Sequence, residues 1–75
     1  MGTEQASFNA ATTKNIEQAL TQKKITRNAL ATKAGIPKST LYRNLNHPDQ
    51  FTLRELGQIA EALEVPFTEL VTDAA

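Results

Sequence analysis

The sequence predicts an all-α fold, a compact bundle of five short helices. Apolar residues recur at the three- and four-residue spacing of amphipathic helices, and no stretch alternates between apolar and polar residues as a β-strand does. Glycine, proline and capping residues interrupt the apolar stretches, which favours short helices joined by short loops. A chain of 75 residues suffices for one domain with a modest core. We expect this domain over residues 7–72, between a disordered tail at 1–6 and a frayed tail at 73–75.

The first helix is expected to begin at Ser7 or Thr13 and to end near Gln22 or Lys23. A basic residue suits the end of this helix, because the helix dipole is negative there. The predicted inward face carries the apolar residues Phe8, Ala11, Ile16, Ala19 and Leu20.

The stretch over residues 26–46, TRNALATKAGIPKSTLYRNLN, organises the chain. Thr26 is a suitable N-cap for a second helix, and Gly35 suits the left-handed conformation that ends it. Pro37 fits the first position of a third helix, expected from Pro37 to Leu45, whose two leucines lie four residues apart on one face. Two short helices joined by a glycine turn, with a polar outer face on the second, are typical of a helix-turn-helix motif. This motif places its second helix in the major groove of DNA.

Thr52 and Glu55 form a capping box that predicts the start of a fourth helix. The apolar stripe of this helix comprises Leu53, Leu56, Ile59, Ala60 and Leu63. Gly57 lies inside it, where glycine costs up to about 1 kcal/mol relative to alanine, so we expect a close contact with another helix there. Pro66 interrupts the pattern, and a short fifth helix is expected after it.

Charged residues are unevenly distributed, although the net charge is zero. Residues 23–43 contain no acidic residue. Residues 44–75 contain a single arginine as their basic residue, and acidic residues outnumber it. The basic residues of the first group are Lys23, Lys24, Arg27, Lys33, Lys38 and Arg43. This asymmetry predicts a positive face that attracts a phosphate backbone despite the neutral total. The alternative interpretation is a solvated pair of charged helices without a ligand.

Composition argues against several other classes of protein. The chain has no cysteine for a disulfide framework or a thiolate metal site. Its apolar runs fall short of the roughly 20 residues that span a bilayer, and its N-terminus lacks a signal pattern, so we expect a cytoplasmic protein without a membrane partner. The single histidine, His47, precedes a proline in a loop and has no triad or metal-ligand spacing around it. We expect no catalytic residue, cofactor, metal or small-molecule substrate.

The runs LATKAGIPKSTLYRNL and TLRELGQIAEALEVPFTELV resemble the Cro/lambda-repressor-like helix-turn-helix domains, also called the XRE family. The resemblance extends from roughly Lys14 to Val71. It implies that the second helix of the motif reads bases while the first lies across the DNA backbone, and that the chain is a phage or bacterial repressor, such as a phage immunity repressor, or an antitoxin. Two positions depart from the family pattern: Arg27 stands where glutamine is frequent, and Asn44 where an apolar residue is usual.

Side-chain chemistry along the motif predicts how DNA is bound. We expect the base-reading residues on the outer face of the third helix to be Lys38, Ser39, Tyr42 and Arg43. Tyr42 has a second interpretation, a surface aromatic that packs on the neighbouring helix. The expected phosphate ligands are Arg27, Thr40, Asn46, Lys23 and Lys24.

The apolar residues of the fifth helix have two possible roles. Phe67, Leu70 and Val71 could form a dimer or partner surface, as in an antitoxin or another protein-interaction module, or they could complete the core. The sequence leaves open whether a homodimer or a monomer binds double-stranded DNA. It also leaves open the operator and the choice between repression and activation.

Overall fold

The computed structural model describes residues 10–71, and it is all-helical there, as the sequence predicts. The elements in chain order are α1 (Ala10–Lys23), α2 (Arg27–Ala34), α3 (Lys38–Asn46), the 3₁₀-helix η1 (Pro48–Gln50), α4 (Leu53–Leu63) and α5 (Phe67–Val71). The expected tails at 1–6 and 73–75, and a helix start at Ser7, lie outside the described residues. Helix α1 already includes Ala10, so Thr13 lies within it and does not cap it. No helix between residues 10 and 71 has the length and apolar character needed to cross a membrane.

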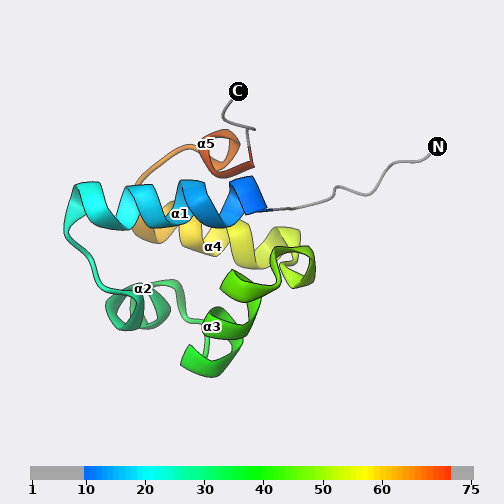
Figure 1. Ribbon diagram of the computed structural model, residues 1–75. Helices are drawn as coiled ribbons and strands as arrows, with labels where there is room; N and C mark the ends of the chain where they lie inside the picture. The colour runs from blue at the N-terminus through cyan, green and yellow to red at the C-terminus, as the bar shows by residue number, and fades with distance from the viewer. Residues whose placement is uncertain (1–9, 72–75) are drawn as a thin grey trace.

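The helices are arranged so that α3 lies on the side of the molecule opposite α5 (Figure 1). Helix α4 packs against α2 and α5, and α1 packs against α5 and α4. Helix α3 is supported mainly by α2 and η1 rather than by the central helices. The second helix of the predicted motif therefore projects from the bundle with one face uncovered.

The core is formed by aliphatic side chains from every α-helix. Its largest fully buried apolar members are Ile16, Leu30, Leu41, Leu56, Ile59, Leu63 and Leu70. Phe51 is also buried, as a residue that packs just before the N-cap of a helix should be. Leu53, expected on the apolar stripe of α4, is instead 63% exposed, because it is the first residue of that helix and lies outside the core.

Local capping chemistry sets the ends of the motif helices. The Thr26 side chain accepts a hydrogen bond from the Ala29 N–H at 3.1 Å, and Gly35 ends α2 with a φ of 73°. Pro37 has a ψ of 141°, which is extended, and its carbonyl accepts from the Leu41 N–H at 2.9 Å. Pro37 is therefore the N-cap of α3 rather than its first residue, and α3 begins and ends one residue later than predicted.

Gly57 does not make the close helix contact that the sequence analysis predicts. A Cβ atom built on this glycine would have no atom of another residue within 4 Å, apart from its chain neighbours and its own helix backbone. The expectation is wrong because the helix turn around Gly57 does not face a neighbouring backbone. The glycine consequently lowers the stability of α4 without a packing benefit.

Gly57→Ala is expected to raise the free energy of unfolding by about 0.5–1 kcal/mol, since alanine is the better helix former and has space for its methyl group. Gly35→Ala is the matched control with the opposite sign. It should destabilise by about 1–2 kcal/mol, because φ at this position lies in the left-handed region that a Cβ disfavours. Urea unfolding followed by circular dichroism measures both changes. A destabilised Gly57→Ala variant would contradict the open space around this position.

Helix α5 completes the core. Leu70 is 1% exposed, and the Asn15 amide of α1 donates to the Leu70 carbonyl at 3.1 Å. Phe67 and Val71 are partly buried and pack against the core. Of the two roles considered for this helix, core closure holds for Leu70, whose side chain has almost no surface left for a partner.

Candidate nucleic-acid interface

The exposed face of α3 carries all four predicted base-reading residues. Lys38, Ser39, Tyr42 and Arg43 are exposed, whereas the inward positions of the same helix are Leu41, Asn44 and Leu45. This separation follows from the 3.6-residue period, which places the leucines on one side and the long polar side chains on the other. Thr40, a predicted phosphate ligand, lies between the two faces and is partly exposed.

Tyr42 joins α3 to α2. Its hydroxyl donates to the Asn28 Oδ1 atom at 2.8 Å, and the guanidinium of Arg27 lies 5.9 Å from the centre of its ring, within cation–π range. The tyrosine is still 40% exposed, so it packs on the neighbouring helix and keeps a free edge. Both interpretations of Tyr42 are therefore compatible with its position.

Asn28 belongs to the same patch, although it was not among the predicted site residues. A shallow hollow of about 250 Å³ is lined by Asn28, Lys38, Ser39 and Tyr42. Asn28 is exposed and directly follows Arg27 in the helix that is expected to cross the DNA backbone. Its place directly after Arg27 is the sequence feature from which Asn28 could have been predicted as a DNA contact. A side-chain amide binds phosphate oxygens as well as base edges.

Arg27, a predicted phosphate ligand, forms an ion pair with Glu17 of α1. The two side chains are 47% and 40% exposed, so the pair is solvated and contributes at most about 1 kcal/mol. A DNA phosphate could displace the carboxylate at little cost. Lys24 lines a hollow of about 410 Å³ together with Glu17 and Arg27, so one of the two adjacent lysines lies beside this pair. Sequence reasoning missed Glu17 because it is ten residues from Arg27, with no local pattern to connect them.

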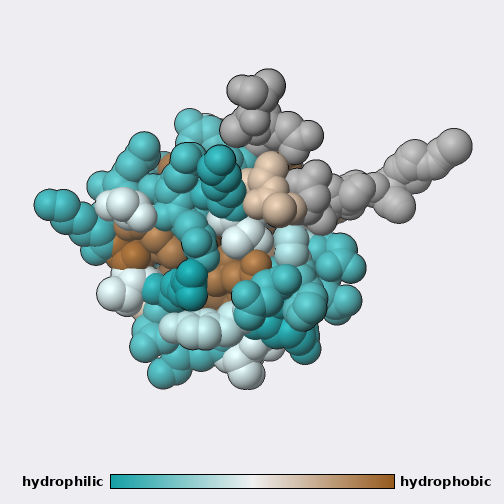
Figure 2. Space-filling model, viewed as in Figure 1, coloured by the Kyte–Doolittle hydropathy of each residue, from teal (hydrophilic) through white to brown (hydrophobic). Residues whose placement is uncertain are grey.

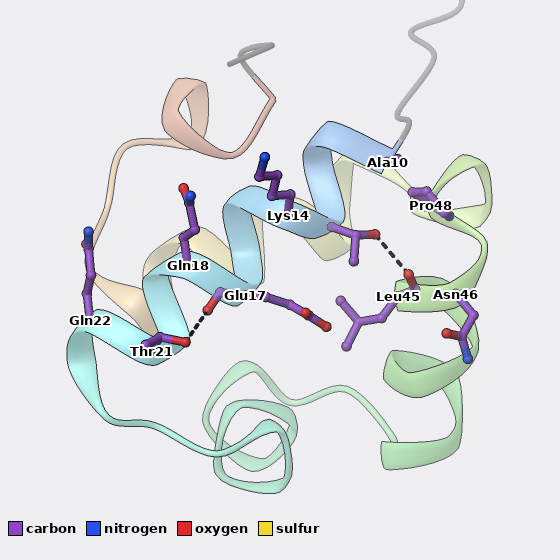
Figure 3. A pocket seen from close by; sticks show the side chains of 10 residues that line it. Ala10, Lys14, Glu17, Gln18, Thr21, Gln22, Leu45, Asn46 and Pro48 are labelled. Atoms are coloured by element: carbon purple, nitrogen blue, oxygen red, sulfur yellow. Dashed lines mark hydrogen bonds between the residues drawn. The ribbon is translucent and has the colours of Figure 1, made fainter. Parts of the chain in front are cut away.

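A larger groove of about 740 Å³ runs between α1 and the C-terminal end of α3 (Figure 3). Glu17 and Leu45 point toward each other across it, and the Thr13 hydroxyl donates to the Leu45 carbonyl at 2.9 Å. This bond ties the end of α3 to α1. Asn46, the last residue of α3, lies at the rim of the groove, at the other end of the helix from Lys38.

The surface around α2 and α3 is predominantly hydrophilic in the view of Figure 2, and the largest apolar area in this view lies in the hollow between α1 and the motif helices. Every basic side chain between Lys23 and Arg43 is exposed. The first turns of α2 and α3 contain no acid, and α3 begins without a side-chain cap. The amide groups at the start of α3 are consequently open to water or to a phosphate, which the helix dipole also favours.

Asn44 is a buried polar residue on the otherwise apolar inner face of α3. It is 1% exposed and lies on the inward side of α3 with Leu41 and Leu45. Its Nδ2 group donates to the Glu55 Oε1 atom at 3.0 Å, and its Oδ1 atom accepts from the Arg43 Nε–H at 3.3 Å. No side-chain polar atom buried within residues 10–71 is left without a partner, so both ends of this amide are satisfied.

Comparison with known proteins agrees with this geometry. The sequence model of the Cro/C1-type HTH DNA-binding domain matches residues 15–75, a span that contains α2 to α5 in full and most of α1. Searches of curated proteins and of solved structures returned no match. The matched family is one of DNA-binding domains, and the matched residues include α3 with its exposed outer face. The chain belongs to the Cro/C1-type helix-turn-helix DNA-binding domain family.

Proposed function

We propose that this chain is a sequence-specific regulator of transcription that binds double-stranded DNA, reads the major groove with α3 and acts as a repressor. The observation that carries the proposal is the projecting helix whose outer face collects Lys38, Ser39, Tyr42 and Arg43. An α-helix fits the major groove, where each base pair presents a distinct pattern of donors and acceptors. Repression is the simplest action of such a domain, because a protein bound over a promoter excludes polymerase.

Base recognition is assigned to the long side chains of α3. Arg43 and Lys38 can donate to the O6 and N7 atoms of guanine, and arginine does so with two parallel hydrogen bonds. Ser39 suits several bases, and the exposed edge of Tyr42 suits a thymine methyl group. Helix α3 has nine residues and is therefore about 13 Å long. One protomer reads only a few base pairs, so we propose that two copies bind a repeated or palindromic site.

Phosphate contacts are assigned to residues that flank α3. Arg27 at the start of α2, Lys24 beside it and Lys23 at the end of α1 form one group, and Thr40 and Asn46 lie on α3 itself. These contacts supply affinity without sequence information, and they fix the register in which α3 enters the groove. Asn28 extends the first group, because it directly follows Arg27 in α2 and is exposed.

Selection of bound duplexes from a random library tests the proposal directly. We expect enrichment of one motif, and its length and symmetry will report how many copies bind. A reporter gene with that motif placed over its promoter should lose expression when the chain is present. Failure to enrich any motif at physiological salt would contradict sequence-specific binding, and unchanged or raised expression would contradict repression.

Arg27→Ala is expected to weaken binding to selected and scrambled duplexes by the same factor, because a phosphate contact is blind to sequence. The slope of log K against log salt should fall in magnitude by about 0.9, the value for one released counterion. Fluorescence anisotropy titrations at several salt concentrations measure both quantities. Lys33→Ala is a charge-matched control, since this exposed lysine lies at the far end of α2 and should leave the slope unchanged. A loss confined to the selected duplex would instead make Arg27 a base contact.

A further inference from the structure

Asn44 is a buried amide at a position that needs no polar group. Within residues 10–71 the buried polar side chains are Thr12 and Asn44, and Asn44 is flanked on the inner face of α3 by Leu41 and Leu45. Burying an amide is unfavourable unless each of its polar atoms finds a partner, so an apolar residue of similar volume would serve packing better. The amide is therefore explained by what it bonds rather than by the core.

The chemistry of its two partners fixes the orientation of the amide. The Glu55 carboxylate only accepts hydrogen bonds and the Arg43 guanidinium only donates them, so Nδ2 must face Glu55 and Oδ1 must face Arg43. The same Glu55 Oε1 atom accepts from the Thr52 N–H at 3.1 Å, and the Thr52 hydroxyl accepts from the Glu55 N–H at 3.0 Å. A continuous series of hydrogen bonds thus connects the capped start of α4 to the outer face of α3.

We infer that Asn44 is a positioning residue, which holds the Arg43 side chain in the orientation that reads a base. The inference rests on the proposed function, because it deepens the role of Arg43. The contact with Asn44 engages only the Nε–H of Arg43 and leaves the two terminal amino groups for guanine. A long side chain that is already restrained loses less conformational freedom when DNA binds. Glu55, whose carboxylate is itself held by the capping box, completes the restraint by fixing the amide.

The restraint is measurable in the full chain without DNA. The ¹⁵N order parameter of the Arg43 Nε–H group should lie above about 0.6, the level below which a group counts as flexible. Arg54 is a suitable internal comparison, because its exposed side chain lies on α4 outside this series of hydrogen bonds. An order parameter for Arg43 as low as that of Arg54 would overturn the inference, whatever the DNA measurements show.

Asn44→Leu removes the amide and keeps a buried side chain with the same branching and the same number of non-hydrogen atoms. We expect this variant to fold, to lower the Arg43 order parameter to the level of Arg54, and to reduce the ratio of selected to scrambled duplex affinity roughly three- to tenfold. In an Arg43→Ala background the same substitution should leave the ratio unchanged, because the side chain that Asn44 positions is gone. A purely structural role would instead lower affinity for both duplexes and would act equally in both backgrounds.

The experiments distinguish a failure of the proposed function from a failure of the positioning role of Asn44. If library selection yields no motif, the proposed function fails, while the order parameter still reports on the Asn44–Arg43 contact. If a motif is found and depends on Arg43, but Asn44→Leu keeps the full affinity ratio, only the positioning role is overturned. Should Asn44→Leu not fold, the order parameter in the unmodified chain decides the question alone.

Discussion

Leu41→Ala is expected to lower the free energy of unfolding by about 2–5 kcal/mol, the largest effect that a single substitution in α3 should produce. Leu41 is fully buried on the inner face of α3 and is one of the side chains that attach this helix to the bundle. A domain of this size is stabilised by only about 4–11 kcal/mol, so the loss is a large fraction of the total. Thermal denaturation followed by circular dichroism should show a fall in Tm of more than about 8 °C.

The matched control is Leu53→Ala, which removes the same atoms from a side chain that is 63% exposed. Its effect should stay within about 0.5 kcal/mol, because little apolar surface leaves the core. Equal losses at the two leucines would contradict the burial of Leu41 and the outward position of Leu53. The comparison also tests whether α3 is attached to the bundle by its leucines.

Arg43→Ala is expected to lower affinity for the selected duplex by about 1–3 kcal/mol and to change affinity for a scrambled duplex much less. Arg43 is exposed on the outer face of α3, and its terminal amino groups are not used by the Asn44 contact. A paired contact with guanine is therefore lost together with one positive charge. Gel-shift or anisotropy titrations on both duplexes, at one fixed salt concentration, measure the difference.

Arg43→Lys separates charge from geometry in this experiment. Lysine keeps the positive charge but lacks the planar fork, so nonspecific affinity should be retained while most of the specificity is lost. Losses of equal size on the two duplexes for Arg43→Ala would remove Arg43 from the base-reading residues. They would leave the fold, the family and the phosphate contacts unaffected.

The outer and inner faces of α3 could be assigned before the structure because both depend on local periodicity. Leu41 and Leu45 face inward and Lys38, Ser39, Tyr42 and Arg43 face outward, since a helix repeats every 3.6 residues wherever it lies in the fold. The two ends of α2 and the start of α4 were equally accessible, although α3 begins and ends one residue later than predicted. Thr26 caps α2, Gly35 ends it in the left-handed region, and Thr52 and Glu55 form the expected capping box, because caps satisfy backbone groups within a few residues of themselves.

Residues whose environment depends on distant parts of the chain could not be assigned in this way. Gly57 was expected at a close contact and lies in open space, because the distance between helices is not encoded in the sequence around it. Leu53 shares the apolar spacing of α4 but lies beyond the core, where periodicity alone cannot tell a buried turn from an exposed one. Leu70 had two possible roles until the packing of α5 on α1 placed it inside.

The sequence by itself determined the five α-helices seen within residues 10–71, the caps of α2 and the capping box of α4, the polar face of α3 and the family, since each follows from interactions among near neighbours or from the order of such elements. Only the tertiary structure decided which side chains meet across the motif: Glu17 with Arg27, Asn28 with Tyr42, and Asn44 with Glu55. These partners are 10 to 14 residues apart on different helices. Their contacts exist because the core holds α1, α2, α3 and α4 at fixed positions, which no local pattern specifies.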